Sequence, residues 1–213
     1  MTPLSIVVLT QNEADNIERC LRSISWCADI ILIDNSTDAT VARAKKIIIP
    51  EHLRIFTKTE SEDFSYLRNF GLEKAQNDWV LFLDADEEVS RELKAEIEIA
   101  LIETNCVGFY LSRADFFMGK WLRYGETADV RLLKLGKKNT GRWEREVHET
   151  WKISGKIDTL RSPLLHFPHP TVAEFLHRIN RWSTLDAQVF YHQGIRSSWW
   201  KVLAYPSGKF LRN

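Results

Sequence analysis

Cysteine is scarce in this chain, and neither sign of charge is in excess. The three cysteines, Cys20, Cys27 and Cys106, form neither the paired spacing of a zinc site nor the even framework of a disulfide-stapled secreted domain. Lysine plus arginine (29) equals aspartate plus glutamate (29), so the chain as a whole is not attracted to nucleic acid. These absences exclude a disulfide scaffold and a general nucleic-acid binder, and they predict a protein of the reducing cytosol.

Long hydrophobic runs are absent as well. No stretch of about 18 uncharged apolar residues occurs, so no membrane-spanning segment is expected. The run Leu4–Leu9 is too short for the core of a signal peptide and no cleavage site follows it, so we expect no export. A chain of 213 residues is long enough for one domain with a short appendage.

The first hundred residues alternate short apolar runs with amphipathic stretches, which predicts a parallel sheet covered by helices. The expected strands are residues 6–9, 30–33, 54–56 and 79–83. Between them we expect helices, the first with Asn12 as its N-cap and the last, after the fourth strand, with Ser90 as its N-cap. The predicted class is α/β and Rossmann-like, with a mainly parallel sheet flanked by helices.

The second half of the chain has a different pattern. Short strand-like pieces with aromatic residues lie at 107–112, 130–135 and 164–167. Thr171 to Glu174 form a capping box that opens a long amphipathic helix. The predicted organisation is a domain of residues 1–170, with halves at 1–104 and 105–170, followed by a C-terminal amphipathic helical extension at 171–213.

Three polar clusters follow the predicted parallel strands, at the edge where ligands of open α/β sheets collect. They are Thr10–Glu13, Asp34–Asp38 and Asp84–Asp86. Asp84 and Asp86 lie one residue apart on a turn, where two carboxylates can share a divalent cation, and oxygen ligands favour magnesium or manganese. The alternative is a solvated acidic turn, because a pair of aspartates at this spacing is common.

Four segments, in this order, resemble the nucleotide-diphospho-sugar glycosyltransferases of family 2, which have the GT-A fold. They are Ser5–Glu13, Ile33–Asp38, Arg68–Leu72 and Trp79–Glu87. Later pieces resemble the subgroup of the lipopolysaccharide core β-1,4-glucosyltransferases: Gly119–Trp121, Arg131–Leu133, Val147–Glu149 and His166. The resemblance implies an inverting hexosyl transfer from a UDP-sugar, with UDP-glucose expected first. Residues 1–104 would be the nucleotide-sugar-binding half and 105–170 the acceptor half of a catalytic domain.

The resemblance also implies a role for individual residues. The donor would be bound by the loop Thr10, Gln11, Asn12 and Glu13, by Asp34 and Arg68, and by Asp84, Ala85 and Asp86. The metal, Mn²⁺ or Mg²⁺, would be held by Asp84, Asp86 and His166, and the imidazole favours manganese. Plain alternatives exist, because Thr10 and Asn12 can be helix caps, Arg68 a surface ion pair and His166 a structural histidine.

An inverting transfer needs a general base that takes the proton of the acceptor hydroxyl. Glu149 lies where the family places its catalytic acidic residue. Glu146 and Asp129 compete with it, and the assignment stays open between the three. A solvent-exposed charged pair is the alternative for Glu149, because carboxylates are ordinarily exposed.

The C-terminal extension combines basic and aromatic residues. Arg196, Lys201, Lys209 and Arg212 are interleaved with Trp199, Trp200, Tyr205 and Phe210. Such a mixture favours a bilayer interface. We therefore expect a peripheral contact with the inner face of the cytoplasmic membrane, a lipid-linked or glycolipid acceptor, and no nucleic-acid partner. Packing on the catalytic domain is the alternative, and it explains Trp182 better than Trp199 and Trp200.

Two other functions stay open on the sequence. A sugar nucleotidyltransferase also uses a nucleotide-binding sheet and a carboxylate-held metal, but it is expected to have a glycine-rich loop after the first strand, and Thr10–Ala14 has no glycine. A non-catalytic sugar- or lipid-binding module could share the fold. The presence of Asp84, Asp86 and Glu149 argues against that module.

Overall fold

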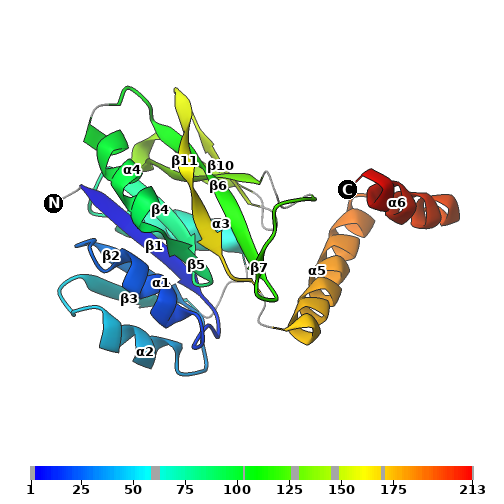
Figure 1. The fold of residues 1–213 in the computed structure, drawn as a ribbon, viewed down its shortest axis with the longest axis horizontal. Coiled ribbons are helices and arrows are strands. Elements are labelled where there is room, and N and C mark those ends of the chain that lie inside the picture. The colour runs from blue at the N-terminus through cyan, green and yellow to red at the C-terminus, as the bar shows by residue number, and fades with distance from the viewer. Residues whose placement is uncertain are drawn as a thin grey trace. The chain divides into compact units, whose positions relative to one another are not determined.

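The computed structural model describes residues 3–58, 63–102, 104–125, 130–144, 149–168 and 171–212. The chain divides into two compact units. The first unit comprises Met1–Ala114 and Asp129–His166, and the second comprises Asp115–Ala128 and Phe167–Asn213. The first is a sheet with helices on its faces, and the second contains a hairpin end and two helices (Figure 1).

The parallel half of the sheet has the strand order β3-β2-β1-β4. These strands are β1 (Leu4–Thr10), β2 (Ile30–Asp34), β3 (Leu53–Thr57) and β4 (Trp79–Asp84), and each pairs with its neighbour in parallel. They are connected by α1 (Ile17–Ile24), α2 (Thr40–Ile47) and α3 (Phe64–Lys74). Every residue of β1 and β2 is buried, as expected of strands covered on both faces. The predicted strands and helices of this half are confirmed.

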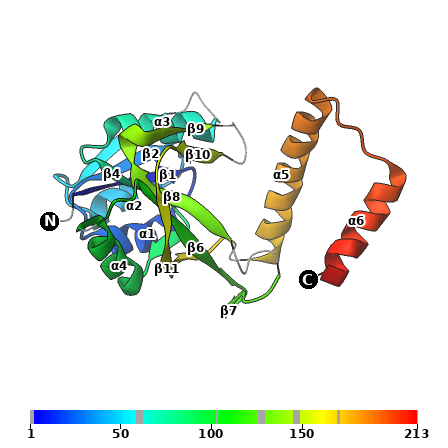
Figure 2. The same ribbon diagram turned by 90° about the horizontal axis from the view of Figure 1, so that it is seen from above.

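The sheet continues beyond β4, and there most neighbouring strands pair antiparallel. In order they are β8 (Arg131–Lys137), β6 (Gly108–Phe117), β11 (Ile157–His166) and β5 (Glu87–Val89). Helix α4 (Arg91–Ile102) packs on β11. A separate pair, β9 (Gly141–Glu144) and β10 (Thr150–Ile153), lies beside α3 (Figure 2). The α/β class, with helices flanking the sheet and a helical extension after it, is confirmed.

The sheet separates two hydrophobic cores. Ile6 and Val8 of β1 belong to the core under α1, and Val7 and Leu9 belong to the core under α3, because successive side chains of a strand point to opposite faces. Gly71 allows α3 to lie close to β1, since a Cβ at that position would stand 2.6 Å from a methyl carbon of Val7. This close approach positions the preceding turn of α3 against the sheet.

Two helix starts agree with the sequence and one does not. The backbone N–H of Leu93 donates to the Ser90 hydroxyl at 3.1 Å, and that of Glu174 donates to the Thr171 hydroxyl at 3.2 Å, so both predicted caps are confirmed. The predicted cap at Asn12 is wrong, because α1 begins only at Ile17. Asn12 has a φ of 57° and accepts a hydrogen bond from the backbone N–H of Thr37 at 2.8 Å. It links two loops instead of capping a helix.

The second unit contains the end of β6 with β7 (Lys120–Trp121), and the helices α5 (Val172–His192) and α6 (Trp199–Arg212). The predicted long helix is confirmed as α5. Its predicted apolar face is not buried: Val172, Leu176, Ile179 and Val189 are between 38% and 54% exposed. Within the part of the chain that the structure describes, neither these helices nor any other is long and apolar enough to cross a membrane.

Candidate active site

The polar clusters meet where three neighbouring strands end. Thr10 and Asp34 are register partners on β1 and β2, and Leu9 is the partner of Asp84 on β4. The Thr10 hydroxyl donates to one carboxylate oxygen of Asp34 at 2.8 Å, and the backbone N–H of Ser36 donates to the other at 3.2 Å. Asp34 is only 2% exposed. These bonds fix its carboxylate, which keeps lone pairs for a further donor.

The loops that follow β1 and β2 are tied together. The backbone N–H of Asn12 donates to the Ser36 hydroxyl at 2.9 Å, and the backbone N–H of Glu13 donates to the Thr40 hydroxyl at 2.9 Å. Gln11 is exposed beside them. The structure thus brings the residues from Thr10 to Glu13 together with Asp34, and these loops act as one platform at the edge of the sheet.

A network of charges lies at the end of β4; it is mostly buried, with the Asp84 side chain 39% exposed. Arg68 of α3 donates from Nη2 to Oδ1 of Asp84 at 2.9 Å and from Nε to Oε1 of Glu149 at 2.9 Å. Lys134 of β8 donates from Nζ to Oδ2 of Asp84 at 2.8 Å and to Oε1 of Glu87 at 2.6 Å. The side chains of Arg68 and Lys134 are each 5% exposed. Both oxygens of Asp84 therefore have a cationic partner within the protein.

This network shifts the protonation equilibria of its members. Burial alone raises the pKa of Asp84, but the charges of Lys134 and Arg68 outweigh burial and hold that pKa well below its usual range. Burial raises the pKa of Glu87, although Lys134 opposes the shift. Burial lowers the pKa of Lys134, yet Asp84 and Glu87 more than compensate and raise it. Asp84 and Lys134 are consequently both charged at neutral pH.

Asp86 and His166 face each other beside this network. β5 pairs with β11 so that His166 lies opposite Glu87, next to Asp86. Nε2 of His166 lies 3.5 Å from Oδ2 of Asp86, and the two side chains are 13% and 10% exposed. Neighbouring ligands of a small divalent cation stand about 3 Å apart, so this imidazole and carboxylate fit one edge of its coordination shell. In the described ranges no group of three or more His, Cys, Asp or Glu is arranged to hold a metal ion, so other ligands would have to come from the diphosphate or water.

An aromatic wall supports Arg68. The rings of Trp143 on β9 and Trp151 on β10 are stacked, with centroids 5.5 Å apart, and the guanidinium carbon of Arg68 lies 4.7 Å from the Trp143 centroid. Asn69 holds the backbone of Trp143 through two hydrogen bonds. Its side-chain amide donates to the Trp143 backbone carbonyl at 2.9 Å and accepts from the Trp143 backbone N–H at 3.0 Å. The wall fixes the plane of the guanidinium, which favours a directional contact with an anion.

Sequence reasoning missed Lys134, Glu87 and the two tryptophans of this wall. One signal was available for Lys134, since it is the charged residue inside the apolar run Leu132–Leu135 of a predicted strand. No sequence signal pairs Trp143 with Trp151, because the strands that carry them are only four residues long. The predicted Ala85 is buried, whereas the predicted Asp129 and Glu146 lie outside the described residues.

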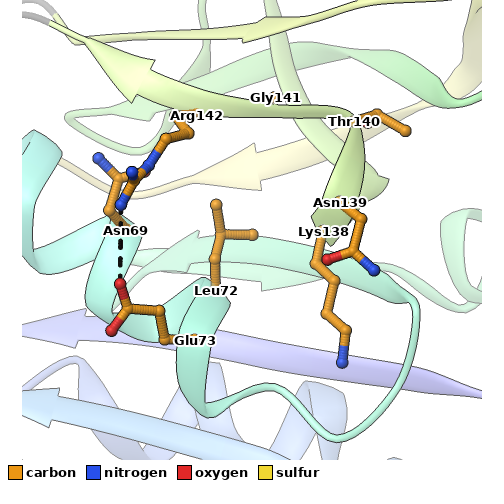
Figure 3. A pocket seen from close by; sticks show the side chains of 8 residues that line it. All are labelled: Asn69, Leu72, Glu73, Lys138, Asn139, Thr140, Gly141 and Arg142. Atoms are coloured by element: carbon orange, nitrogen blue, oxygen red, sulfur yellow. Dashed lines mark ion pairs between the residues drawn. The ribbon is translucent and has the colours of Figure 1, made fainter.

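A surface pocket of ≈ 470 Å³ lies between α3 and the turn before β9 (Figure 3). It is lined by Asn69, Leu72, Glu73, Lys138, Asn139, Thr140, Gly141 and Arg142. None of the residues predicted for donor, metal or proton transfer lines it. The candidate site is thus defined by the convergence of the strand ends and not by this pocket.

Comparison with known proteins assigns the chain to a family. The model of the family described as glycosyl transferase family 2 matches residues 5–162. The lipopolysaccharide core biosynthesis glycosyltransferase LpsC of Rhizobium meliloti is 27% identical over 99% of this chain and 80% of its own length. An uncharacterized glycosyltransferase of Rickettsia typhi is 25% identical over 96% of this chain and 77% of its own length.

The fold is shared with solved structures. A fragment of TarS from S. aureus in complex with UDP has a TM-score of 0.61 and 16% identity, and the match covers 78% of this chain and 61% of that chain. At this identity the likeness shows the fold alone, and our chain spans less than two thirds of the solved one. The family match covers the strands, α3 and the turn at Asp84 on which the predicted resemblance rested. The chain therefore belongs to glycosyl transferase family 2.

Proposed function

We propose that the protein transfers a sugar, with UDP-glucose the first expected donor, onto a lipid-linked or lipopolysaccharide-type acceptor with inversion at the anomeric carbon. Membership of family 2 supports the reaction class. The similarity to LpsC, which is named for lipopolysaccharide core biosynthesis, supports the acceptor class. The observation that carries the site is the convergence of Asp34, Arg68 and Asp84 at neighbouring strand ends.

The donor lies across the strand ends in this proposal. The loop Thr10–Glu13 and Asp34 bind the base and the ribose. Arg68, held between Asp84 and the Trp143 ring, directs its charge toward the diphosphate. Both oxygens of Asp84 already have a cationic partner within the protein. We therefore place Asp84 beside the ribose and not on the metal. Residues 1–104 then form the donor half of the catalytic domain, and residues 105–170 form the acceptor half.

Asp86 and His166 are the side chains that would hold Mn²⁺ or Mg²⁺ in this proposal, since they lie close together and are largely buried. The bound cation would offset the negative charge that develops on the departing diphosphate. The imidazole comes from the end of β11, and the carboxylate comes from the turn that directly precedes β5, the strand paired with β11.

Glu149 is the proposed base. Its carboxylate accepts from Arg68 at 2.9 Å and its side chain is 17% exposed, so it is oriented yet reachable. It takes the proton of the acceptor hydroxyl as that oxygen attacks the anomeric carbon. Asp129 and Glu146 stay alternatives for this role.

Hydrolysis of nucleotide sugars tests the function, because donor hydrolysis needs no acceptor. We expect UDP release from UDP-glucose to be at least about tenfold faster with manganese than with a chelator, a difference of about 1.4 kcal/mol. Asp86→Asn and His166→Ala should lose this metal dependence. Glu88→Gln is a matched control, because Glu88 lies on β5, two residues after Asp86, with its carboxylate near Arg19. Release that is equally fast with chelator would remove the metal from the proposal.

The second unit is proposed to contact the inner face of the cytoplasmic membrane. Trp199, Trp200 and Phe210 of α6 are 78%, 53% and 85% exposed. Basic residues near anionic lipid contribute about 1 kcal/mol each, and salt screens that contribution but not the aromatic one.

The full chain should therefore float with vesicles that contain phosphatidylglycerol. Flotation should weaken, without vanishing, at high salt. The double substitution Trp199→Ser with Phe210→Ser should reduce flotation several-fold. Ile99→Ser on α4, where Ile99 is 72% exposed, should not. Protein that stays out of the vesicle fraction at low salt would contradict the membrane contact.

A further inference from the structure

Exposed apolar side chains gather at the end of β6 as well as on the helices of the second unit. Met118, Trp121, Leu122 and Tyr124 are 64%, 40%, 38% and 86% exposed. They lie within one short stretch that belongs to the same unit as α5 and α6. Isolated exposed apolar residues need no explanation, but a contiguous group of this kind marks an interaction surface.

The stretch is a tight hairpin. Phe116 pairs with Trp121 and Phe117 with Lys120, which leaves Met118 and Gly119 as the two turn residues. Both have positive φ, 49° for Met118 and 81° for Gly119. Such a two-residue turn suits the twist of the strands, and it places the large Met118 side chain at the tip despite the unfavourable backbone conformation of a non-glycine residue there.

An aromatic cluster fixes the base of this hairpin. The Phe116 ring lies 5.0 Å from the Trp121 ring and 5.5 Å from the Phe167 ring, measured between centroids. Phe117 packs against Phe175, on the first turn of α5, at 5.4 Å. The hairpin and the start of α5 are therefore held together by aromatic packing, and the apolar tip lies beyond this cluster.

The charge of the surface indicates its partner. Residues 116–125 contain no Asp or Glu, whereas Lys120 and Arg123 are exposed there. Residues 187–213 also contain no Asp or Glu, whereas Arg196, Lys201 and Lys209 are present. Two copies of this chain that joined through these surfaces would bring like charges together. An anionic bilayer offers both an apolar interior and a complementary charge.

We propose that the hairpin tip, residues 117–124, is a second membrane-inserting element, distinct from α6. Met118 and Leu122 enter the interface between headgroups and acyl chains, Trp121 and Tyr124 lie at headgroup level, and Lys120 and Arg123 meet anionic lipid. This inference rests on the proposed membrane contact of the second unit. In this inference the hairpin, which directly follows the first unit in the sequence, binds the membrane that carries the lipid-linked acceptor.

Site-specific labelling tests the hairpin directly. The native thiols Cys20, Cys27 and Cys106 are free and buried, so a polarity-sensitive dye will react with an introduced exposed cysteine. Met118→Cys reports on the hairpin, Trp199→Cys on α6, and Ile99→Cys is an exposed control on α4. Each labelled full-length protein is mixed with vesicles of phosphatidylcholine alone or with phosphatidylglycerol.

We expect a blue shift of the dye at positions 118 and 199 with anionic vesicles, and none at position 99. Met118→Asp should also lower flotation several-fold relative to Ile99→Asp. A shift at 199 without one at 118 would overturn the hairpin and leave α6 as the contact, and no shift at either would overturn both. A shift at 118 that grows with protein concentration in the absence of lipid would identify a second copy as the partner and overturn the proposal. Hydrolysis of UDP-glucose, measured on the same samples, reports separately on the catalytic function.

Discussion

Replacement of Glu149 by glutamine is expected to lower turnover by about 10²- to 10⁴-fold, the usual contribution of a general base. Glutamine keeps an oxygen that can accept from Arg68, so the guanidinium stays in position. UDP affinity should therefore change by less than about threefold, since the lost proton acceptor acts only in the transition state. Calorimetry gives the affinity, and transfer to a membrane-borne acceptor gives the turnover.

The competing carboxylates supply the comparison for this substitution. Asp129→Asn and Glu146→Gln, measured in the same assay, should each retain turnover within about tenfold of the unaltered protein. If Glu149→Gln stays active while Asp129→Asn is inactive, Asp129 is the base. Loss of UDP affinity in Glu149→Gln would instead show that the pair with Arg68 supports the donor site.

Replacement of Lys134 by methionine should destabilise the fold by about 3–5 kcal/mol, the cost of breaking a buried ion pair by removal of one partner. Methionine fills a similar volume but leaves Glu87, whose side chain is 1% exposed, without its cation. Asp84 loses one of its two cationic partners in the same step. Urea unfolding followed by circular dichroism measures the change.

The compensating variant makes this prediction specific. Lys134→Met combined with Glu87→Gln removes the uncompensated charge and should recover at least about 1 kcal/mol, because the two side chains are in contact and their effects couple. Lys152→Met is the matched control. The side chains of Lys152 and its partner Glu144 are 66% and 55% exposed, so we expect the free energy of unfolding to change by no more than about 1 kcal/mol. A loss below about 1 kcal/mol in Lys134→Met would show that the network does not stabilise the fold.

Much of the fold was predictable from local signals. The strands β1, β2 and β4 are long apolar runs, and their ends coincide with the polar clusters, so the edge that gathers Thr10, Asp34 and Asp84 follows from the order of the chain. The pairings β9–β10 and β5–β11 were not predictable in the same way. The strands β5, β9 and β10 are only three or four residues long and have no clear period. For β5 the partner is also distant in the sequence, since Val89 pairs with Leu164.

The site was less predictable than the fold for the same reason. Asp84 was recognised from its turn, but its partner Lys134 comes from a strand 50 residues later, and the pairing depends on the antiparallel register of β4 and β8. The prediction for Asn12 failed for the opposite reason, because it gave a local signal too much weight. A local capping preference was overridden by a contact with a loop 25 residues away.

Because Arg68 bonds two carboxylates at once, it constrains any attempt to re-engineer the protein. One guanidinium donates from Nη2 to Asp84, proposed to lie at the donor, and from Nε to Glu149, the proposed proton acceptor. A substitution at either carboxylate therefore alters the charge balance that the other experiences, and the free-energy effects of the two will not add. Libraries that vary donor preference around Asp84 should be screened together with compensating changes at Glu149, because the proposed roles of these two carboxylates would be thermodynamically linked through this one side chain.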